Sequence, residues 1–268
     1  MNTIPITELD DPRLDPYRDL KHADVSRRGQ NFIAEGHLVV SRLFASDYET
    51  SSVLAEPNRL AILKDVIDSQ TPVYVVERDL IGQVAGFDFH RGVLASGRRK
   101  PLLTMEQLAQ SCLPYATALS AISLTDAENV GSLIRTASAL GIGDFVINRQ
   151  SIDPLCRRVL RVSMGTALKM RFYDLSEPEV WFEQNGVTGD WQTIAMTLSD
   201  DSVPLELVPR DERPKMIVMG NEVDGLPPSI QRVCHIRANI PMAAGVDSLN
   251  VAVAGGIALY ELTRPIRQ

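Results

Sequence analysis

The sequence predicts an α/β protein with two domains, a small one followed by a larger one with a mostly parallel sheet. Three observations support this prediction. Short apolar runs alternate with segments of helical periodicity along most of the 268 residues. Aliphatic residues are plentiful while aromatic residues make up only 6% of the chain, which suits layers of helices and strands. A basic, proline-containing stretch at residues 96–104 separates two series of alternating elements.

The first third of the chain reads as an arm, a small domain and a linker. Residues 1–29 are rich in charge and proline, so we expect a solvated arm with one short helix near residues 17–25. The next stretch predicts helices at residues 32–45, 59–67 and 79–84, and strands at residues 52–55, 73–76 and 92–95. We therefore place a small α/β domain at residues 30–97 and a linker at residues 98–114.

The larger domain, residues 115–268, repeats the alternation at greater length. Strands are expected at residues 118–124, 144–147, 170–173, 193–198, 216–219 and 235–242, with helices at 130–140, 155–162, 177–184 and 251–262. Such alternation predicts a mostly parallel sheet covered on both faces. Ser248 is the expected N-cap of the last helix. That helix is apolar on nearly every side, which predicts burial in a core or a subunit interface.

Composition narrows the function classes. The net charge is −7, so the chain as a whole is not coated in basic surface, although a local basic face remains open. The three cysteines lack CxxC spacing and the four histidines stand apart, so we expect neither disulfides nor a metal site. The longest nearly uncharged apolar run, residues 251–260, is too short to cross a bilayer. The N-terminal residues show no basic region followed by an apolar core, so we expect no signal peptide. We expect a cytoplasmic protein with no membrane association.

Two glycine-containing loops are the candidate binding site. The turn at residues 220–225 and the loop at residues 240–250 each follow a predicted strand and precede a helix. Ligands in open α/β sheets bind at the carboxyl ends of the strands, so these loops predict a small-molecule pocket. Neither GxGxxG nor GxxxxGK[ST] occurs, which disfavours a Rossmann oxidoreductase and a P-loop protein. Taken alone, the turn is more often structural than functional, and the preferred interpretation is that Asn129 is a helix cap and Arg135 a surface charge.

Three blocks of sequence together carry a family resemblance. They are NVGSLIRTASALG at residues 129–141, IVMGNEVDGL at 217–226 and IPMAAGVDSLNVAVA at 240–254. In order and spacing they resemble the signature motifs of the SpoU/TrmH family of RNA ribose 2′-O-methyltransferases, part of the SPOUT superfamily. FIAEGHLVVSRL and HRGVLASG, within residues 30–97, resemble the ribosomal-protein-L30e-like domain that many members use to bind RNA substrate.

The resemblance implies a fold, a reaction and site residues. It implies a SPOUT-type parallel sheet with a deep trefoil knot, a homodimer, S-adenosylmethionine as methyl donor, and rRNA or tRNA as substrate. One block departs from the usual pattern, because Ala244 stands where many members have glycine and Gly245 follows, so the loop is expected to turn one residue later. The implied catalytic residues are Arg135, Asn129, Glu222, Ser248 and Asn250, and the implied cofactor-binding residues are Leu198, Gly220, Glu222, Gly225, Ile240, Met242 and Leu249.

Chemistry limits the role that Arg135 can have. A 2′-hydroxyl is a poor nucleophile until its proton is removed or held, but a guanidinium stays protonated and accepts nothing. Arg135 is therefore expected to hold the ribose or phosphate and to stabilise developing negative charge. Residues 149–171 carry six basic side chains against one acid, Asp153, which favours RNA contact there. The alternative is a non-catalytic RNA-binding protein that keeps the fold.

Overall fold

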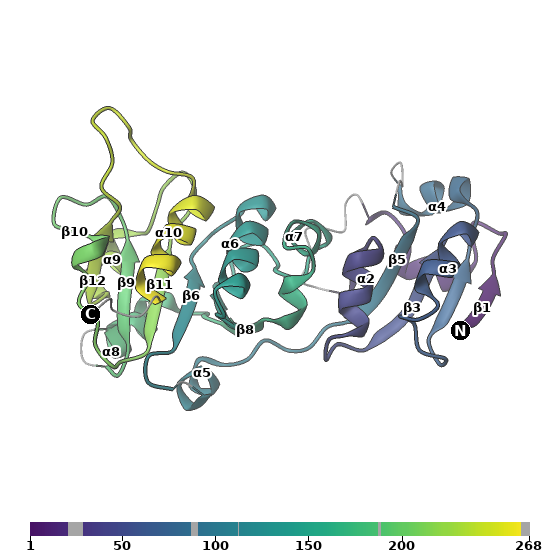
Figure 1. The fold of residues 1–268 in the computed structure, drawn as a ribbon, viewed down its shortest axis with the longest axis horizontal. Helices are drawn as coiled ribbons and strands as arrows, with labels where there is room; N and C mark the ends of the chain where they lie inside the picture. Colours follow the sequence, from purple (N-terminus) through teal and green to yellow (C-terminus); the bar gives the residue numbers. More distant parts are fainter. Residues whose placement is uncertain (21–28, 87–90, 112, 187–188, 264–268) are drawn as a thin grey trace. The chain divides into compact units, whose positions relative to one another are not determined.

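The computed structural model describes residues 1–20, 29–86, 91–111, 113–186 and 189–263, which form two compact units (Figure 1). The first unit contains residues 1–101 together with 153–169, and the second contains the rest. Each unit has a sheet of its own. The basic segment at 153–169 thus packs with the first unit, although by sequence it lies inside the larger domain.

The first unit is a mixed five-stranded sheet with helices. The strand order is β1 (Asn2–Pro5), β4 (Pro72–Val75), β3 (Thr50–Ala55), β5 (Val93–Arg98) and β2 (Asn31–Glu35). β1, β4 and β3 run parallel, and β5 is antiparallel to both β3 and β2. The described residues of this unit form the α-helices α2 (His37–Phe44), α3 (Leu60–Leu63), α4 (Arg78–Ala85) and α7 (Arg157–Val162), with 3₁₀ turns η1 (Pro12–Tyr17), η2 (Pro57–Arg59) and η3 (Thr166–Lys169).

The N-terminal segment is not a solvated arm where the structure describes it. β1 extends the sheet beside β4, and η1 buries Leu14 and Tyr17 completely. The Tyr17 hydroxyl is hydrogen-bonded to Ser52 Oγ at 2.7 Å, and burial raises the pKa of Tyr17. The charged residues that suggested a solvated arm form local ion pairs, such as the one between Arg13 and Asp11. Residues 21–28, and with them most of the predicted first helix, lie outside the described residues.

The prediction of a helix at residues 32–45 is wrong for residues 32–35. Residues Asn31–Glu35 form β2, and Gly36, with a φ of 87°, turns the chain into α2. Four consecutive residues of β2 are buried, because this strand is covered on both faces. A strand of that kind has a continuous apolar run without alternation, and the run merged with the helical spacing of α2 that follows it.

The second unit confirms the parallel sheet. Its seven strands are β10 (Val203–Pro204), β12 (Ile236–Asn239), β9 (Gln192–Met196), β11 (Lys215–Met219), β6 (Thr117–Ala121), β7 (Asp144–Ile147) and β8 (Arg171–Asp174), in that order. Every neighbouring pair is parallel. All six expected strands are present, and the two-residue β10 is additional.

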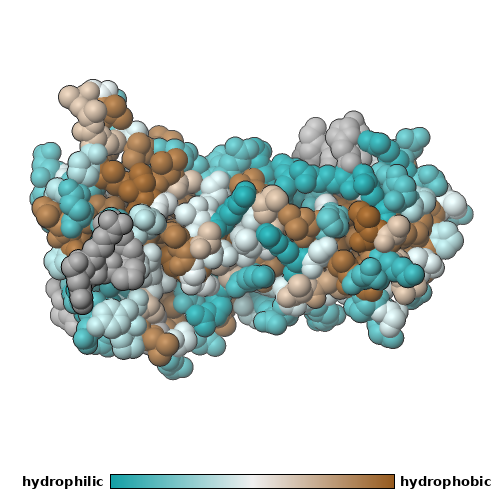
Figure 2. Space-filling model, viewed as in Figure 1, coloured by the Kyte–Doolittle hydropathy of each residue, from teal (hydrophilic) through white to brown (hydrophobic). Residues whose placement is uncertain are grey.

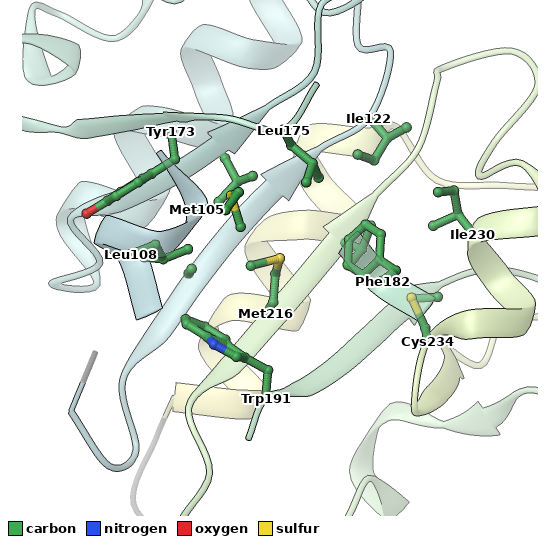
Figure 3. Close-up of a cluster of buried hydrophobic side chains, with 14 of the residues drawn as sticks. Met105, Leu108, Ile122, Tyr173, Leu175, Phe182, Trp191, Met216, Ile230 and Cys234 are labelled. Atoms are coloured by element: carbon green, nitrogen blue, oxygen red, sulfur yellow. The ribbon is translucent and has the colours of Figure 1, made fainter. Parts of the chain in front are cut away.

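Helices cover both faces of this sheet. α6 (Ala127–Ala139) and α10 (Val251–Thr263) lie side by side on one face (Figure 1). α5 (Met105–Ser111), α8 (Pro178–Gly186) and α9 (Pro228–Val233) enclose an apolar core with the other face (Figure 3). Met105 and Leu108 of α5 are buried in this core, so the expected linker at residues 98–114 contains a packed element of the second unit. None of the helices in the described residues is long and apolar enough to span a membrane.

Candidate functional site

A cavity of about 660 Å³ lies in the second unit where three parallel strands end. Its walls are the loops after β9, β11 and β12, together with the first turn of α6 and the start of α10. The volume falls within the range of small-molecule and cofactor sites. The position is where the sequence predicted a pocket, since the carboxyl ends of parallel strands share one edge of the sheet.

The structure brings nearly all the predicted site residues to this cavity. Arg135 is the exception, because it is exposed on α6 and does not line the cavity. It follows Asn129 by six residues, which places it about 9 Å further along the helix axis and on a different face. The predicted residues that line the cavity are Asn129, Leu198, Gly220, Glu222, Gly225, Ile240, Met242, Ser248, Leu249 and Asn250.

A chain of hydrogen bonds joins the three sequence blocks. Asn250 Nδ2 donates to Asn129 Oδ1 at 2.9 Å, and Asn129 Nδ2 donates to Glu222 Oε1 at 3.1 Å. Glu222 also accepts the backbone N–H groups of Asp126 at 3.2 Å and Thr125 at 3.4 Å, just before α6. An acidic side chain suits this place, because helix N-termini stabilise negative charge. The carboxylate therefore links the loop after β11 to the beginning of α6.

The turn after β11 depends on two glycines and one asparagine. The backbones of Asn221 and Gly225 exchange two hydrogen bonds of 3.0 Å, which close the turn. A Cβ on Gly220 would come within 2.3 Å of the Gly225 carbonyl carbon, and Gly225 has a φ of 68°, so both positions require glycine. Asn221 Nδ2 donates to Ser123 O at 2.8 Å, while its Oδ1 accepts the Val223 N–H at 2.9 Å.

The last loop differs from expectation at its helix cap. Asn250, not Ser248, caps α10, since its Oδ1 accepts the N–H groups of Ala252 at 2.9 Å and Val253 at 3.2 Å. Both residue types cap helices well, so sequence alone could not choose between them. The loop has its left-handed residue at Gly245, with a φ of 84°, and not at Ala244. The loop between β12 and α10 projects from the second unit (Figure 1).

The cavity wall contains polar residues that sequence reasoning missed. Thr197 Oγ1 donates to Gln231 Oε1 at 3.0 Å, and Gln231 Nε2 donates to Leu226 O at 2.7 Å. These bonds tie the loop after β9 to the loop after β11. Gln231 lies outside the three sequence blocks and carried no motif signal, whereas Asn221 stands directly before Glu222 and could have been singled out as a turn former.

Apolar side chains stand exposed at the rim of the cavity. Leu198 is 55% exposed and Leu249 is 37% exposed, and Ile240 lines the cavity beside them. Polar backbone of the Gly220–Gly225 turn lies nearby, so the site offers an apolar surface for a flat ring together with hydrogen-bonding groups for a sugar. Among the described residues, no cluster of three or more His, Cys, Asp or Glu side chains could hold a metal ion.

Comparison with known proteins agrees with this architecture. Residues 117–260 match the model of the SpoU rRNA Methylase family. An uncharacterized tRNA/rRNA methyltransferase of Mycobacterium bovis is 34% identical, with 97% of this chain and 91% of the relative covered. The 23S rRNA (guanosine-2′-O-)-methyltransferase RlmB of Acinetobacter baylyi is 31% identical over 79% of this chain and 81% of its own. The AdoMet-bound rRNA methyltransferase of Sinorhizobium meliloti superposes with a TM-score of 0.81 at 25% identity, covering 99% of both chains. The chain belongs to the SpoU rRNA methylase family.

Proposed function

We propose that this protein transfers a methyl group from S-adenosylmethionine to a ribose 2′-hydroxyl of a structured rRNA or tRNA in the cytoplasm. The observation that carries the proposal is the single cavity in which all three sequence blocks meet. The activity named for the Acinetobacter baylyi relative, and the AdoMet bound to the Sinorhizobium meliloti structure, support it.

The residues of the cavity fit this methyl donor. Leu198, Ile240 and Leu249 would hold the adenine, and the Gly220–Gly225 turn would face the ribose. The backbone of Gly220 lies directly against Gly225 and Leu226, and the two hydrogen bonds between Asn221 and Gly225 close the turn. S-adenosylmethionine supplies an electrophilic methyl group on a positively charged sulfur.

The side chains would act by positioning and by electrostatics. The ribose 2′-oxygen forms a bond to the methyl carbon as the carbon–sulfur bond breaks and the hydroxyl proton leaves to solvent. Glu222 already accepts three N–H donors, so it is better suited to fixing Asn129 than to taking that proton. Asn129 and Asn250 would orient the target, and Arg135 would stabilise negative charge developing on the ribose. Alignment of the two reacting atoms would supply much of the acceleration.

A homodimer and a knot are part of the proposal. Val253, Ile257 and Tyr260 of α10 are 53%, 40% and 56% exposed and recur at helical spacing, and apolar surface also gathers at the base of the loop before α10 (Figure 2). Exposed apolar stripes of this kind mark interaction sites. α10 follows β12 yet packs on α6 and β11, so the chain returns from β12 past β9 to the middle of the sheet, a path compatible with the proposed trefoil knot.

Two measurements on the full chain test the function. Calorimetry with S-adenosylmethionine should show binding that Gly220→Val abolishes, since a larger side chain cannot fit against Gly225. Labelled methyl groups should then pass from the donor to RNA extracted from cells that lack this protein. RNA binding without measurable donor binding would instead favour the non-catalytic RNA-binding alternative.

A further inference from the structure

A second cavity, of about 260 Å³, lies in the first unit at the beginning of α2. It is lined by the Glu35 carboxylate, by the first turn of this helix and by three arginines from separate parts of the chain, Arg59, Arg91 and Arg161. The cofactor cavity belongs to the other unit, so neither the proposed donor nor its loops account for these arginines. We propose that this cavity binds a phosphate group of the RNA backbone.

Positive charge exceeds negative charge around the cavity. Glu35 is 4% exposed and receives Arg157 Nη1 at 2.7 Å, Arg91 Nε at 3.4 Å and Arg161 Nη1 at 3.9 Å. One carboxylate therefore faces three guanidinium groups. The closest pair, with Arg157, anchors the carboxylate, while the longer distances leave Arg91 and Arg161 able to bind an anion. Guanidinium groups are the usual partners of phosphate because they present several N–H donors in one plane.

Arg59 adds a cation that has no acidic partner among the described residues. Its side chain lies across Gly92, where a Cβ would come within 2.5 Å of Arg59 Nε. The Nε–H group is buried and has no hydrogen-bond acceptor in the described part of the chain. An unsatisfied buried donor is costly, and an anion in the adjoining cavity would reduce that cost. Gly92 thereby lets a guanidinium lie close to the sheet at the cavity wall.

The first turn of α2 supplies backbone donors at the same place. The first helical bond runs from Val40 N–H to Gly36 O, and Gly36 has no side chain with which to cap the helix. The N–H groups of His37, Leu38 and Val39 find no acceptor within the described residues. Free N–H groups at the positive end of a helix form a favourable anion site. Together with the three arginines, these N–H groups line the cavity with donors, and its one carboxylate, Glu35, already receives three guanidinium groups.

The size and the apolar part of the lining indicate a nucleic-acid phosphate. Leu38, Ile62 and Met164 complete the wall, so a sugar attached to the phosphate would meet apolar surface. RNA as the source of the phosphate rests on the proposed function, whereas the anion site itself does not. Inorganic phosphate is the other source of the same chemistry, and a binding experiment separates the two.

The test compares Arg59→Gln/Arg161→Gln with Arg98→Gln, a matched control. Arg98 is an exposed arginine of the same unit, outside the cavity, with its guanidinium 3.5 Å from Glu49. Binding of a mixed-sequence RNA hairpin to each full-length protein is measured across salt concentrations. We expect the double variant to lose about tenfold in affinity and its salt slope to fall by about 1, while Arg98→Gln binds like the original protein. Titration with inorganic phosphate should shift the amide resonances of His37 and Leu38 in the original protein only.

Several results would overturn the assignment. An unchanged RNA affinity and salt slope in the double variant contradicts it, and so does phosphate binding that persists in that variant. Phosphate binding that is lost without any change in RNA affinity would assign the cavity to free phosphate. If the double variant does not fold, the single variant Arg161→Gln should still reduce the salt slope. The Arg161 side chain is 38% exposed, so this substitution disturbs little packing. If no RNA accepts methyl groups from the original protein but its RNA affinity depends on these arginines, the proposed function fails and the phosphate site stands.

Discussion

At the scale of single residues, Glu222 joins the loop after β11 to the start of α6. Replacing Glu222 with alanine removes the acceptor of two backbone N–H groups and of Asn129. We expect a loss of stability of about 1 kcal/mol and a fall in methyl transfer of about 100-fold, because Asn129 and Asn250 lose their fixed orientation. Urea unfolding and a labelled-methyl assay measure the two effects.

Glu183 offers a matched control for Glu222. It is an exposed carboxylate of α8, outside the cavity, and its side chain takes part in no hydrogen bond or ion pair within the described residues. Glu183→Ala should keep both stability and methyl transfer close to those of the original protein. Equal activity in the two variants would show that the Glu222 contacts do not organise the site.

Arg135 should matter for reaction and not for folding. It is exposed, and nothing in the described residues pairs with it, so Arg135→Ala should change the free energy of unfolding by less than about 0.5 kcal/mol. We expect methyl transfer to fall by about 100-fold or more, since a positive charge near the ribose is lost. Arg232→Ala, on α9, removes an exposed arginine from the other face of the sheet and should leave the rate unchanged. A similar rate in both variants would remove Arg135 from the catalytic group.

Most of the site could be predicted residue by residue, because the three sequence blocks are local and specific. The hydrogen-bond partners could not. Glu222 and Asn129 are far apart in sequence, and only the parallel order of β11 and β6 brings them together. The cap of α10 was misassigned because Ser248 and Asn250 are both good caps, and the backbone alone decides which one reaches Ala252.

At the scale of elements, α10 packs on α6 through a glycine contact. A Cβ on Gly255 would come within 2.3 Å of Leu133 Cδ2, whereas one on Gly256 would lie 3.5 Å from Thr136 Cγ2. Gly256→Ala should therefore stabilise the protein by up to about 1 kcal/mol through helix propensity. Gly255→Ala should destabilise it, because overpacking costs about 1–3 kcal/mol. Urea unfolding of both variants measures the difference, and equal midpoints would contradict this packing.

The titration of His235, the residue directly before β12, should affect stability. Burial, together with the nearby Arg213 guanidinium, lowers the pKa of His235, and Arg213 Nη1 donates to its Nε2 at 2.9 Å. The folded protein therefore binds this proton less readily than the unfolded chain. Stability should fall as pH decreases from about 6.5, the unfolded value, towards the lower folded pKa.

The His235→Gln variant isolates that contribution. Urea unfolding of both proteins at several pH values between about 7.5 and 5.5 should show a steeper loss of stability with falling pH in the original protein. Other groups titrate in both proteins and cancel in the comparison. Parallel curves would mean that His235 titrates alike in the folded and unfolded chains.

The elements that sequence reasoning recovered are those with clear periodicity and glycine or polar ends. Six of the seven strands of the second unit, all except the two-residue β10, were predicted, because each is a short apolar run followed by a turn. β1 and β2 were missed for two different reasons. β1 is a four-residue edge strand with little burial, and β2 is buried on both sides and joined to a helix by a single glycine.

At the scale of the whole molecule, the exposed stripe of α10 predicts self-association. Ile257→Lys places a charge in the middle of that stripe, so sedimentation should show a dimer for the original protein and a monomer for the variant. Val180→Lys, on α8, is a control, because Val180 is similarly exposed at 45% but lies on the other face of the sheet. An original protein that sediments as a monomer would contradict the proposed dimer.

The assignment of residues 153–169 to the first unit also belongs to this scale. The basic excess at residues 149–171 favoured RNA contact, but Arg157 forms an ion pair with Glu35, and Arg171 forms one with Asp144. Sequence could count the charges but could not show which of them are paired, since pairing depends on contacts between residues about 120 positions apart. RNA contact by the remaining basic residues stays a prediction.

Identification of the methylated position tests the function most directly. RNA from cells that lack the protein is incubated with the purified full-length chain and S-adenosylmethionine carrying a labelled methyl group, then digested to nucleosides and separated. Methyl transfer to ribose predicts label in a 2′-O-methylated nucleoside, and about 100-fold less of it when Glu222→Ala or Arg135→Ala is used. Label on a base, or an absence of label in every rRNA and tRNA fraction, would contradict it.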